Sequence, residues 1–277
     1  MKKTSSNLSF SILSGIIAGM FLIFTACNTS SKKQEETKDV TGDTGKQEVT
    51  IEEMIGYPVP TSFEITELIR DAGAPYILTL SNAPEMAGNY ITQKEKALNL
   101  GIYATDLCYA STYMMNQATM QFLEASRTLS DELGITTSFN MNYAERIENN
   151  LNNRDSLISI VAGSFYDTWD YLVENSQDIL ARLVVSGSWI EGIYITANIA
   201  GTSRDNTEFL KILANQKSSL NTIVSLLGQV KDSEEAADIF NGLNDIKGVY
   251  EQVGETMTAG QLEELTVRIE ALRESII

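Results

Sequence analysis

Residues 183–200 read LVVSGSWIEGIYITANIA, and this stretch decides the fold class. A helix that is apolar on all sides is buried, either in a protein core or in a bilayer. Glu191 stands at the centre of the stretch, with Ser186, Ser188 and Thr196 around it. A carboxylate and several hydroxyls are costly in lipid, so the stretch predicts the central helix of a soluble helical bundle.

A second stretch, Leu98 to Leu123, also carries few charges on any side and is predicted to form the other buried central helix. Two glycines, Gly187 and Gly192, lie inside the first stretch. A glycine inside a helix costs about 0.5–1 kcal/mol relative to alanine, so a compensating contact is expected. The simplest such contact is a close crossing with another helix.

The later part of the chain predicts amphipathic outer helices. Apolar residues recur at helical spacing in four stretches, which are residues 158–172, 213–227, 239–250 and 262–276. The fold class is therefore predicted to be all-α, a multi-helix bundle around two buried central helices. A shorter first helix is predicted from a capping box at Thr61 to a stop at Gly73. Residues 76–80 have strand propensity but no visible partner strand, so they are interpreted as an extended connector.

The two central stretches share a short motif. Gly101–Thr105 reads GIYAT and Gly192–Thr196 reads GIYIT, 91 residues later. Each motif precedes an amphipathic segment that ends in Leu-Gly, at residues 133–134 and 227–228. A degenerate two-fold repeat and a coincidence of composition both account for this match.

The N-terminus has the layout of an export signal. Lys2 and Lys3 precede a short apolar run, which ends in Thr25-Ala26-Cys27. This segment resembles the signal peptide and lipobox of a bacterial lipoprotein. The resemblance implies a signal peptide at residues 1–26, and a membrane anchor of diacylglycerol and palmitate on Cys27. An ordinary signal peptide cleaved after Ala26 is the alternative.

Residues 27–50 are predicted to be a flexible tether, and residues 51–277 a single α-helical domain. The tether after Cys27 has no aromatic residue and valine as its only aliphatic type, so it cannot bury enough surface to order itself. Asn28 follows the cysteine, where Gram-negative lipoproteins kept in the inner membrane often carry Asp. The resemblance thus implies the outer membrane, with the domain facing either the periplasm or the cell surface.

Composition excludes several classes of function. The formal net charge is −17, which disfavours binding to nucleic acid. The chain contains no histidine, so Ser-His-Asp and Cys-His catalysis and histidine-containing metal sites are excluded. Once Cys27 is acylated, Cys108 is the only thiol and cannot form an internal disulfide. We predict no cofactor, no metal and no enzymatic activity.

Polar residues on the two central helices are the candidates for function. Asp106 and Glu191 are carboxylates predicted to be buried, and unpaired burial of a charge costs several kcal/mol. One hypothesis places them in a ligand pocket for a small cationic or polyhydroxylated molecule. Its aromatic walls would be Tyr103, Tyr109, Tyr113, Trp189 and Tyr194.

The alternative for these carboxylates is structural. Asp106 and Glu191 would then bond tyrosine hydroxyls, Arg154 or Arg182, and fix the register of the helices. The function predicted is a non-catalytic binding or scaffolding module of the cell envelope, whose partner is a small molecule or an envelope protein. The competing prediction is a glycosidase-like enzyme with Asp106 and Glu191 as acid and base, roughly 5–10 Å apart in an open cleft.

Overall fold

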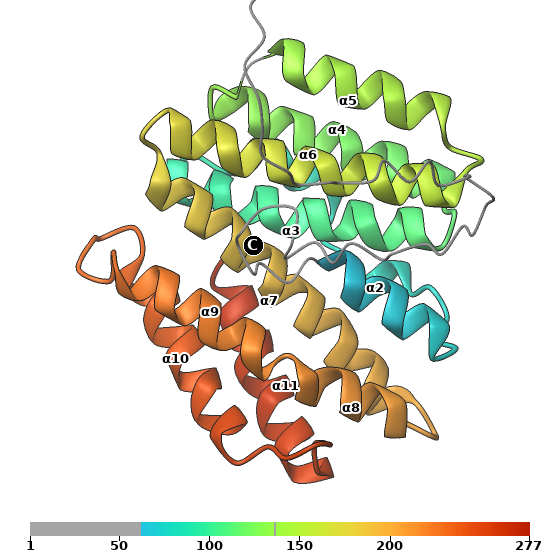
Figure 1. Ribbon diagram of the computed structural model, residues 1–277, viewed down its shortest axis with the longest axis vertical. Helices are drawn as coiled ribbons and strands as arrows, with labels where there is room; N and C mark the ends of the chain where they lie inside the picture. Colours follow the sequence, from blue (N-terminus) through green and yellow to red (C-terminus); the bar gives the residue numbers. More distant parts are fainter. Residues whose placement is uncertain (1–61, 136) are drawn as a thin grey trace, which may run out of the picture. The chain divides into compact units, whose positions relative to one another are not determined.

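The computed structural model describes residues 62–135 and 137–277 of the chain (Figure 1). These residues form ten α-helices and two 3₁₀ turns, with no strand among them, which confirms the predicted all-α bundle. The predicted signal peptide, the tether with Cys27, and the capping residue Thr61 lie outside the described residues. The elements are α2 (Ser62–Asp71), η1 (Leu78–Leu80), η2 (Pro84–Asn89), α3 (Gln93–Thr112), α4 (Asn116–Glu132), α5 (Thr137–Asn149), α6 (Arg154–Glu174), α7 (Asp178–Thr202), α8 (Thr207–Asn215), α9 (Lys217–Gly228), α10 (Ala237–Glu251) and α11 (Ala259–Glu274).

Helices α3 and α7 form the centre of the bundle, as predicted, and share the most extensive helix contact. Helices α4 and α6 pack on α3, while α8, α9 and α11 pack on α7, and α2 contacts both central helices (Figure 1). Among the described residues, α7 is the one helix long and apolar enough to cross a membrane. Its most apolar window is 78% buried inside the bundle, as expected for a core helix.

The crossing of α3 and α7 depends on two glycines. A Cβ atom added to Gly101 would lie 2.0 Å from the carbonyl oxygen of Val184. One added to Gly187 would lie 2.0 Å from the carbonyl oxygen of Leu98. The two backbones therefore touch directly, and this contact confirms the close crossing predicted from the glycines inside the α7 sequence.

The second apolar stretch, Leu98 to Leu123, is not a single helix. Helix α3 ends at Thr112, and the chain turns back through Met114, whose φ is +56°. The Met115 amide donates to the carbonyl of Ala110 at 2.9 Å, which closes the turn before α4 begins. No glycine or proline marks this reversal, so the composition gave no sign of it.

The predicted connector and helix stop are both present. Gly73 adopts a left-handed φ of +88°, and the Ala74 amide donates to the carbonyl of Ile69 at 3.0 Å. Residues 76–80 contain the single turn η1 and join no sheet.

The segments matched in the predicted repeat have different surroundings. Gly101 packs against the backbone of α7, whereas Gly192 faces the side chain of Ile65 in α2. Gly134 ends its helix with a φ of +78°, whereas Gly228 is still the last helical residue of α9. The two motifs therefore have different structural roles.

Candidate functional site

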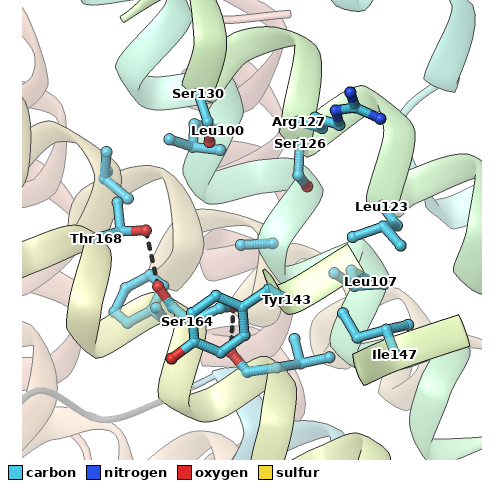
Figure 2. A pocket seen from close by; sticks show the side chains of 14 residues that line it. Leu100, Leu107, Leu123, Ser126, Arg127, Ser130, Tyr143, Ile147, Ser164 and Thr168 are labelled. Carbon is cyan, nitrogen blue, oxygen red and sulfur yellow. Dashed lines mark hydrogen bonds between the residues drawn. The ribbon is translucent and has the colours of Figure 1, made fainter. Parts of the chain in front are cut away.

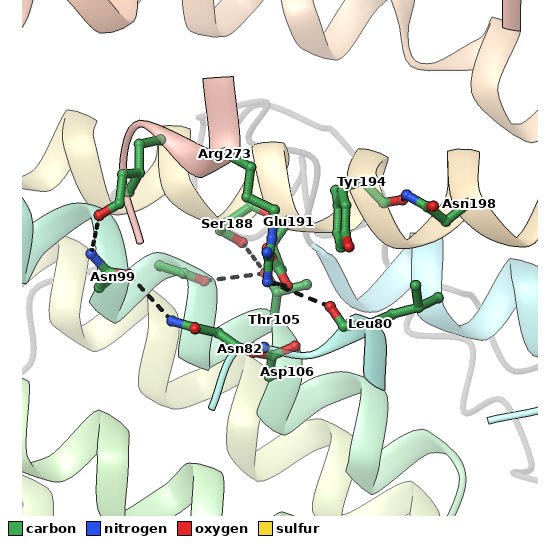
Figure 3. A network of polar contacts seen from close by, with 12 residues as sticks. Leu80, Asn82, Asn99, Thr105, Asp106, Ser188, Glu191, Tyr194, Asn198 and Arg273 are labelled. Carbon is green, nitrogen blue, oxygen red and sulfur yellow. Dashed lines mark hydrogen bonds and ion pairs between the residues drawn. The ribbon is translucent and has the colours of Figure 1, made fainter. Parts of the chain in front are cut away.

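A buried polar network joins three helices and the segment before α3 (Figure 3). Asp106 comes from α3, Glu191 from α7 and Arg273 from the last turn of α11. The two carboxylates are 0% exposed and Arg273 is 6% exposed. The structure thus brings together the two carboxylates singled out from the sequence and adds a cation to them.

Glu191 and Arg273 form a two-pronged ion pair. Arg273 Nε donates to Glu191 Oε2 at 2.5 Å, and Nη2 donates to Oε1 at 2.9 Å. The guanidinium also lies over the ring of Tyr194, with 4.2 Å between its carbon and the ring centroid. Burial raises the pKa of Glu191, and the charge of Arg273 acts in the opposite direction. Burial acts to lower the pKa of Arg273, but its partner carboxylates outweigh burial and raise it.

Asp106 is the third member of the cluster. Its Oδ2 accepts a hydrogen bond from the backbone amide of Asn82 at 3.0 Å, whereas its buried Oδ1 has no hydrogen-bond partner among the described residues. Burial, and then the charge of Glu191, raise the pKa of Asp106 well above its usual range, while the Asn82 amide opposes this. Because Glu191 already has a cation, we assign the proton of the carboxyl pair to Asp106.

Two asparagines extend the network towards the C-terminus. Asn82 Nδ2 donates to the hydroxyl of Tyr90 at 2.9 Å and to Asn99 Oδ1 at 3.5 Å. Asn99 Nδ2 in turn donates to the carbonyl of Ile276 at 2.9 Å. The end of α11 is thereby fastened to α3 and to the segment before it.

Three of the predicted aromatic residues hold the connector between α2 and α3. The hydroxyls of Tyr103, Tyr109 and Tyr113 all form hydrogen bonds with the backbone of residues 74–83. Burial raises the pKa of Tyr109 to about 12, so this side chain keeps its proton at neutral pH. The hydroxyls of these three tyrosines therefore hold the connector in place against α3.

The remaining two aromatic residues point to different places. The ring centroid of Trp189 is 6.5 Å from that of Tyr250 in α10, whereas Tyr194 stacks on Arg273. The structure does not gather the five aromatic residues around one cavity. The alternative hypothesis, in which Asp106 and Glu191 bond other core residues, describes them better than the pocket hypothesis does. The partners that it named for them were wrong. Arg154 pairs with its neighbour Asp155, and Arg182 donates to a carbonyl of α9.

Sequence reasoning missed Arg273, Asn82 and Asn99. Helical spacing could have indicated that Arg273 is buried. It lies four residues after Ile269 and three before Ile276, both of which are buried. The predicted stripe instead placed Leu272 at this position. Leu272 is half-buried and packs against Gly242 of α10, one helix away from the network.

No protein-family model, no curated protein and no solved structure matches this chain. The chemistry of the site is therefore argued from its geometry. Within residues 62–135 and 137–277, no three His, Cys, Asp or Glu side chains are placed to hold a metal ion. Asp106 and Glu191 are both 0% exposed, so neither carboxyl faces the open cleft that the glycosidase-like hypothesis requires.

Proposed function

We propose that the protein is a lipid-anchored, non-catalytic binding or scaffolding module of the bacterial cell envelope. The observation that carries the non-catalytic part is the closed state of Asp106 and Glu191. Glu191 is paired with Arg273, Asp106 accepts a hydrogen bond from the Asn82 amide, and neither carboxyl has any exposed surface. Groups that must meet a substrate need an accessible geometry, which this cluster does not have.

The anchoring part is supported by the N-terminal sequence. The apolar run that ends in Thr25-Ala26-Cys27 is typical of lipoprotein signal peptides, and Asn28 favours the outer membrane. A net charge of −17 would repel an anionic membrane surface. A covalent lipid would therefore hold the chain at the membrane despite its charge.

Metabolic labelling with radioactive palmitate tests the anchor. We expect the wild-type chain to carry label and to sediment with outer membranes, and the Cys27→Ala variant to lose both properties. A Cys108→Ala variant is the matched control, because Cys108 is buried in α3 and should not affect labelling. Equal labelling of wild type and Cys27→Ala would contradict the proposal.

Protease treatment of intact and lysed cells then identifies the face of the membrane. Digestion of the protein on intact cells indicates a surface-exposed domain that meets external ligands. Protection until lysis indicates a periplasmic domain and favours an envelope scaffold. A periplasmic marker protein must stay intact in the first sample for either result to count.

A further inference from the structure

The cavity between α3, α4, α5 and α6 is too small for an organic ligand. Its volume is about 60 Å³, and four small hydroxyl residues line it together with apolar side chains (Figure 2). These hydroxyl residues are Ser126 and Ser130 of α4 and Ser164 and Thr168 of α6. A cavity of about 150 Å³ holds benzene, so this space has no room for a molecule of that size. A ligand site must therefore lie elsewhere in the bundle.

A larger pocket, of about 270 Å³, lies where α11 meets α7. Tyr194 lines it from α7, Glu270, Arg273 and Glu274 line it from α11, and Ile277 follows that helix. Glu274 and Ile277 are exposed, so the pocket is open to solvent. Its volume is well above the space that benzene needs, so it has room for a molecule built on a six-membered ring.

Arg273 belongs both to the buried network and to this pocket. Its side chain is 8% exposed, and its Nε and Nη2 donate to Glu191, with Nη2 also 3.4 Å from the carbonyl oxygen of Leu80. The third nitrogen, Nη1, has no hydrogen bond to any described residue and is not among the enclosed atoms of the core. Because Arg273 lines the pocket, the N–H groups of Nη1 are the ones that a ligand oxygen can reach.

Two carboxylates without a cation lie at the same pocket. Glu270 and Glu274 are one helical turn apart and form no ion pair within residues 62–135 and 137–277, whereas Glu264 of the same helix pairs with Arg268. Burial raises the pKa of Tyr194, Arg273 opposes this, and the charges of Glu270 and Glu274 add to the rise, as expected for carboxylates close to its ring. Like charges one turn apart repel each other, and a cation bound beside them would remove that repulsion.

The charge of the pocket decides which ligand it favours. Glu191 pairs with Arg273 through two hydrogen bonds and offsets its charge, so the free carboxylates of Glu270 and Glu274 make the pocket negative. Arg273 then acts as a hydrogen-bond donor through Nη1, more than as a free cation. Figure 3 shows Tyr194 next to Arg273, where its ring adds apolar surface to this polar wall.

We propose that this pocket binds a small ammonium compound that carries hydroxyl groups, such as an amino sugar. The ammonium would bind Glu270 and Glu274, and a hydroxyl oxygen would accept a hydrogen bond from Arg273 Nη1. Tyr194 and Ile277 would contact the carbon skeleton. This inference rests on the proposed binding function and gives it a site and a ligand class.

Ligand-observed NMR titrations with three probes test the proposal. Glucosamine, at a slightly acidic pH that keeps its amine protonated, carries both the charge and the hydroxyls. N-acetylglucosamine lacks the charge, and cyclohexylamine lacks the hydroxyls. The protein is used as cells produce it, with any lipid that it carries and in the same detergent throughout. We expect glucosamine to bind at least tenfold more tightly than N-acetylglucosamine and severalfold more tightly than cyclohexylamine.

Salt provides a second measurement. Glucosamine affinity should fall as salt is added, because the contact with Glu270 and Glu274 is open to solvent. No detectable binding of glucosamine, or equal affinity for glucosamine and either other probe, would overturn the proposal.

The decisive variant combines Glu270→Gln with Glu274→Gln. It keeps the size of both side chains and leaves Arg273 and the buried network unchanged. We expect at least a tenfold loss of glucosamine affinity, with the thermal transition retained. The control combines Glu263→Gln in α11 with Glu251→Gln in α10, because both residues are exposed and lie outside the pocket. It changes the net charge equally and should bind glucosamine like wild type. Equal loss in both double variants would show that only the overall charge matters and would overturn the proposal.

The two proposals fail separately. Palmitate labelling that persists when glucosamine does not bind removes the ligand site and leaves the anchored module. Glucosamine binding without palmitate labelling removes the anchor and leaves the site.

Discussion

The face of α3 that meets α7 and the face that meets α4 and α6 are packed in opposite ways. Towards α7, the backbones touch at Gly101 and Gly187, and Glu191 is paired with Arg273. Towards α4 and α6, small hydroxyl residues leave a cavity of about 60 Å³. The first face holds the two helices in direct backbone contact, and the second is less closely packed.

This difference shows that the buried charges of this bundle stabilise its structure. Buried charges attract interest in a sequence, but here they join α3, α7 and α11 into one unit. The less tightly packed face contains mostly neutral residues that no sequence motif marks.

Substitution of the crossing glycines should have the largest effect. We expect Gly101→Ala to reduce the free energy of unfolding by more than about 4 kcal/mol, because its Cβ would lie 2.0 Å from a backbone oxygen of α7. Gly248→Ala in α10 is the control, since a Cβ there meets nothing within 4 Å. It should stabilise by about 0.5–1 kcal/mol. Urea unfolding measures both, and similar midpoints for the two variants would contradict the backbone contact.

Removal of the buried cation, Arg273, should cause the second-largest loss in the free energy of unfolding. Arg273→Met leaves Glu191 charged and unpaired in the core, so we expect a loss of about 3–5 kcal/mol in the free energy of unfolding. Combining it with Glu191→Leu should recover most of this loss, because no buried charge then remains. Arg268→Met, on the same helix but in surface pairs, should change stability by no more than about 1 kcal/mol. A double variant as unstable as Arg273→Met would argue against this account.

The sequence was sufficient for features that depend on one helix at a time. The small number of charges marked the apolar parts of α3 and α7 as buried, and Gly187 inside a helix predicted a close crossing. Asp106 and Glu191 were both identified as buried carboxylates, because they interrupt otherwise apolar stretches. Each of these inferences needs only the period of the helix and the cost of burying a charge.

Features that depend on contacts between distant segments were missed. Arg273 follows Leu272 in the α11 stripe, and arginine is normally assigned to solvent, so its burial against α7 was not foreseen. The turn at Met114 uses a left-handed residue without the glycine that usually reveals one. The cavity depends on small side chains of α4 and α6 that lie close together in space, which no local pattern reveals.

The proton on Asp106 should make stability depend on pH. Its folded-state pKa is raised by burial and by Glu191, so the folded protein holds a proton that the unfolded chain releases. The contribution of this group is fully present below the usual aspartate pKa and is lost as pH rises through the raised value. Asp106→Asn mimics the protonated form, so we expect it to gain stability relative to wild type between pH 5 and pH 8.

Urea unfolding of wild type and Asp106→Asn across this range measures the effect. Glu251→Gln, an exposed carboxylate of α10, is the control and should leave the pH profile of wild type unchanged. A difference between Asp106→Asn and wild type that shrinks with increasing pH would place the proton elsewhere.

The smallest expected effect comes from a comparison of two threonines, one on each side of α3. Thr105 Oγ1 lies 3.0 Å from both the carbonyl oxygen and the hydroxyl of Ser188, so it bonds α3 to α7. Thr168 Oγ1 bonds only the carbonyl of Ser164 in its own helix. We expect Thr105→Val to cost about 1–2 kcal/mol in the free energy of unfolding, because it removes a buried hydrogen bond between two helices. Thr168→Val should change it by less than about 0.5 kcal/mol, since it removes only a local bond and keeps the shape of the cavity wall. Equal costs in urea unfolding would show that both faces of α3 are equally dependent on their hydroxyls, and the contrast between a locked and an adaptable face would then be lost.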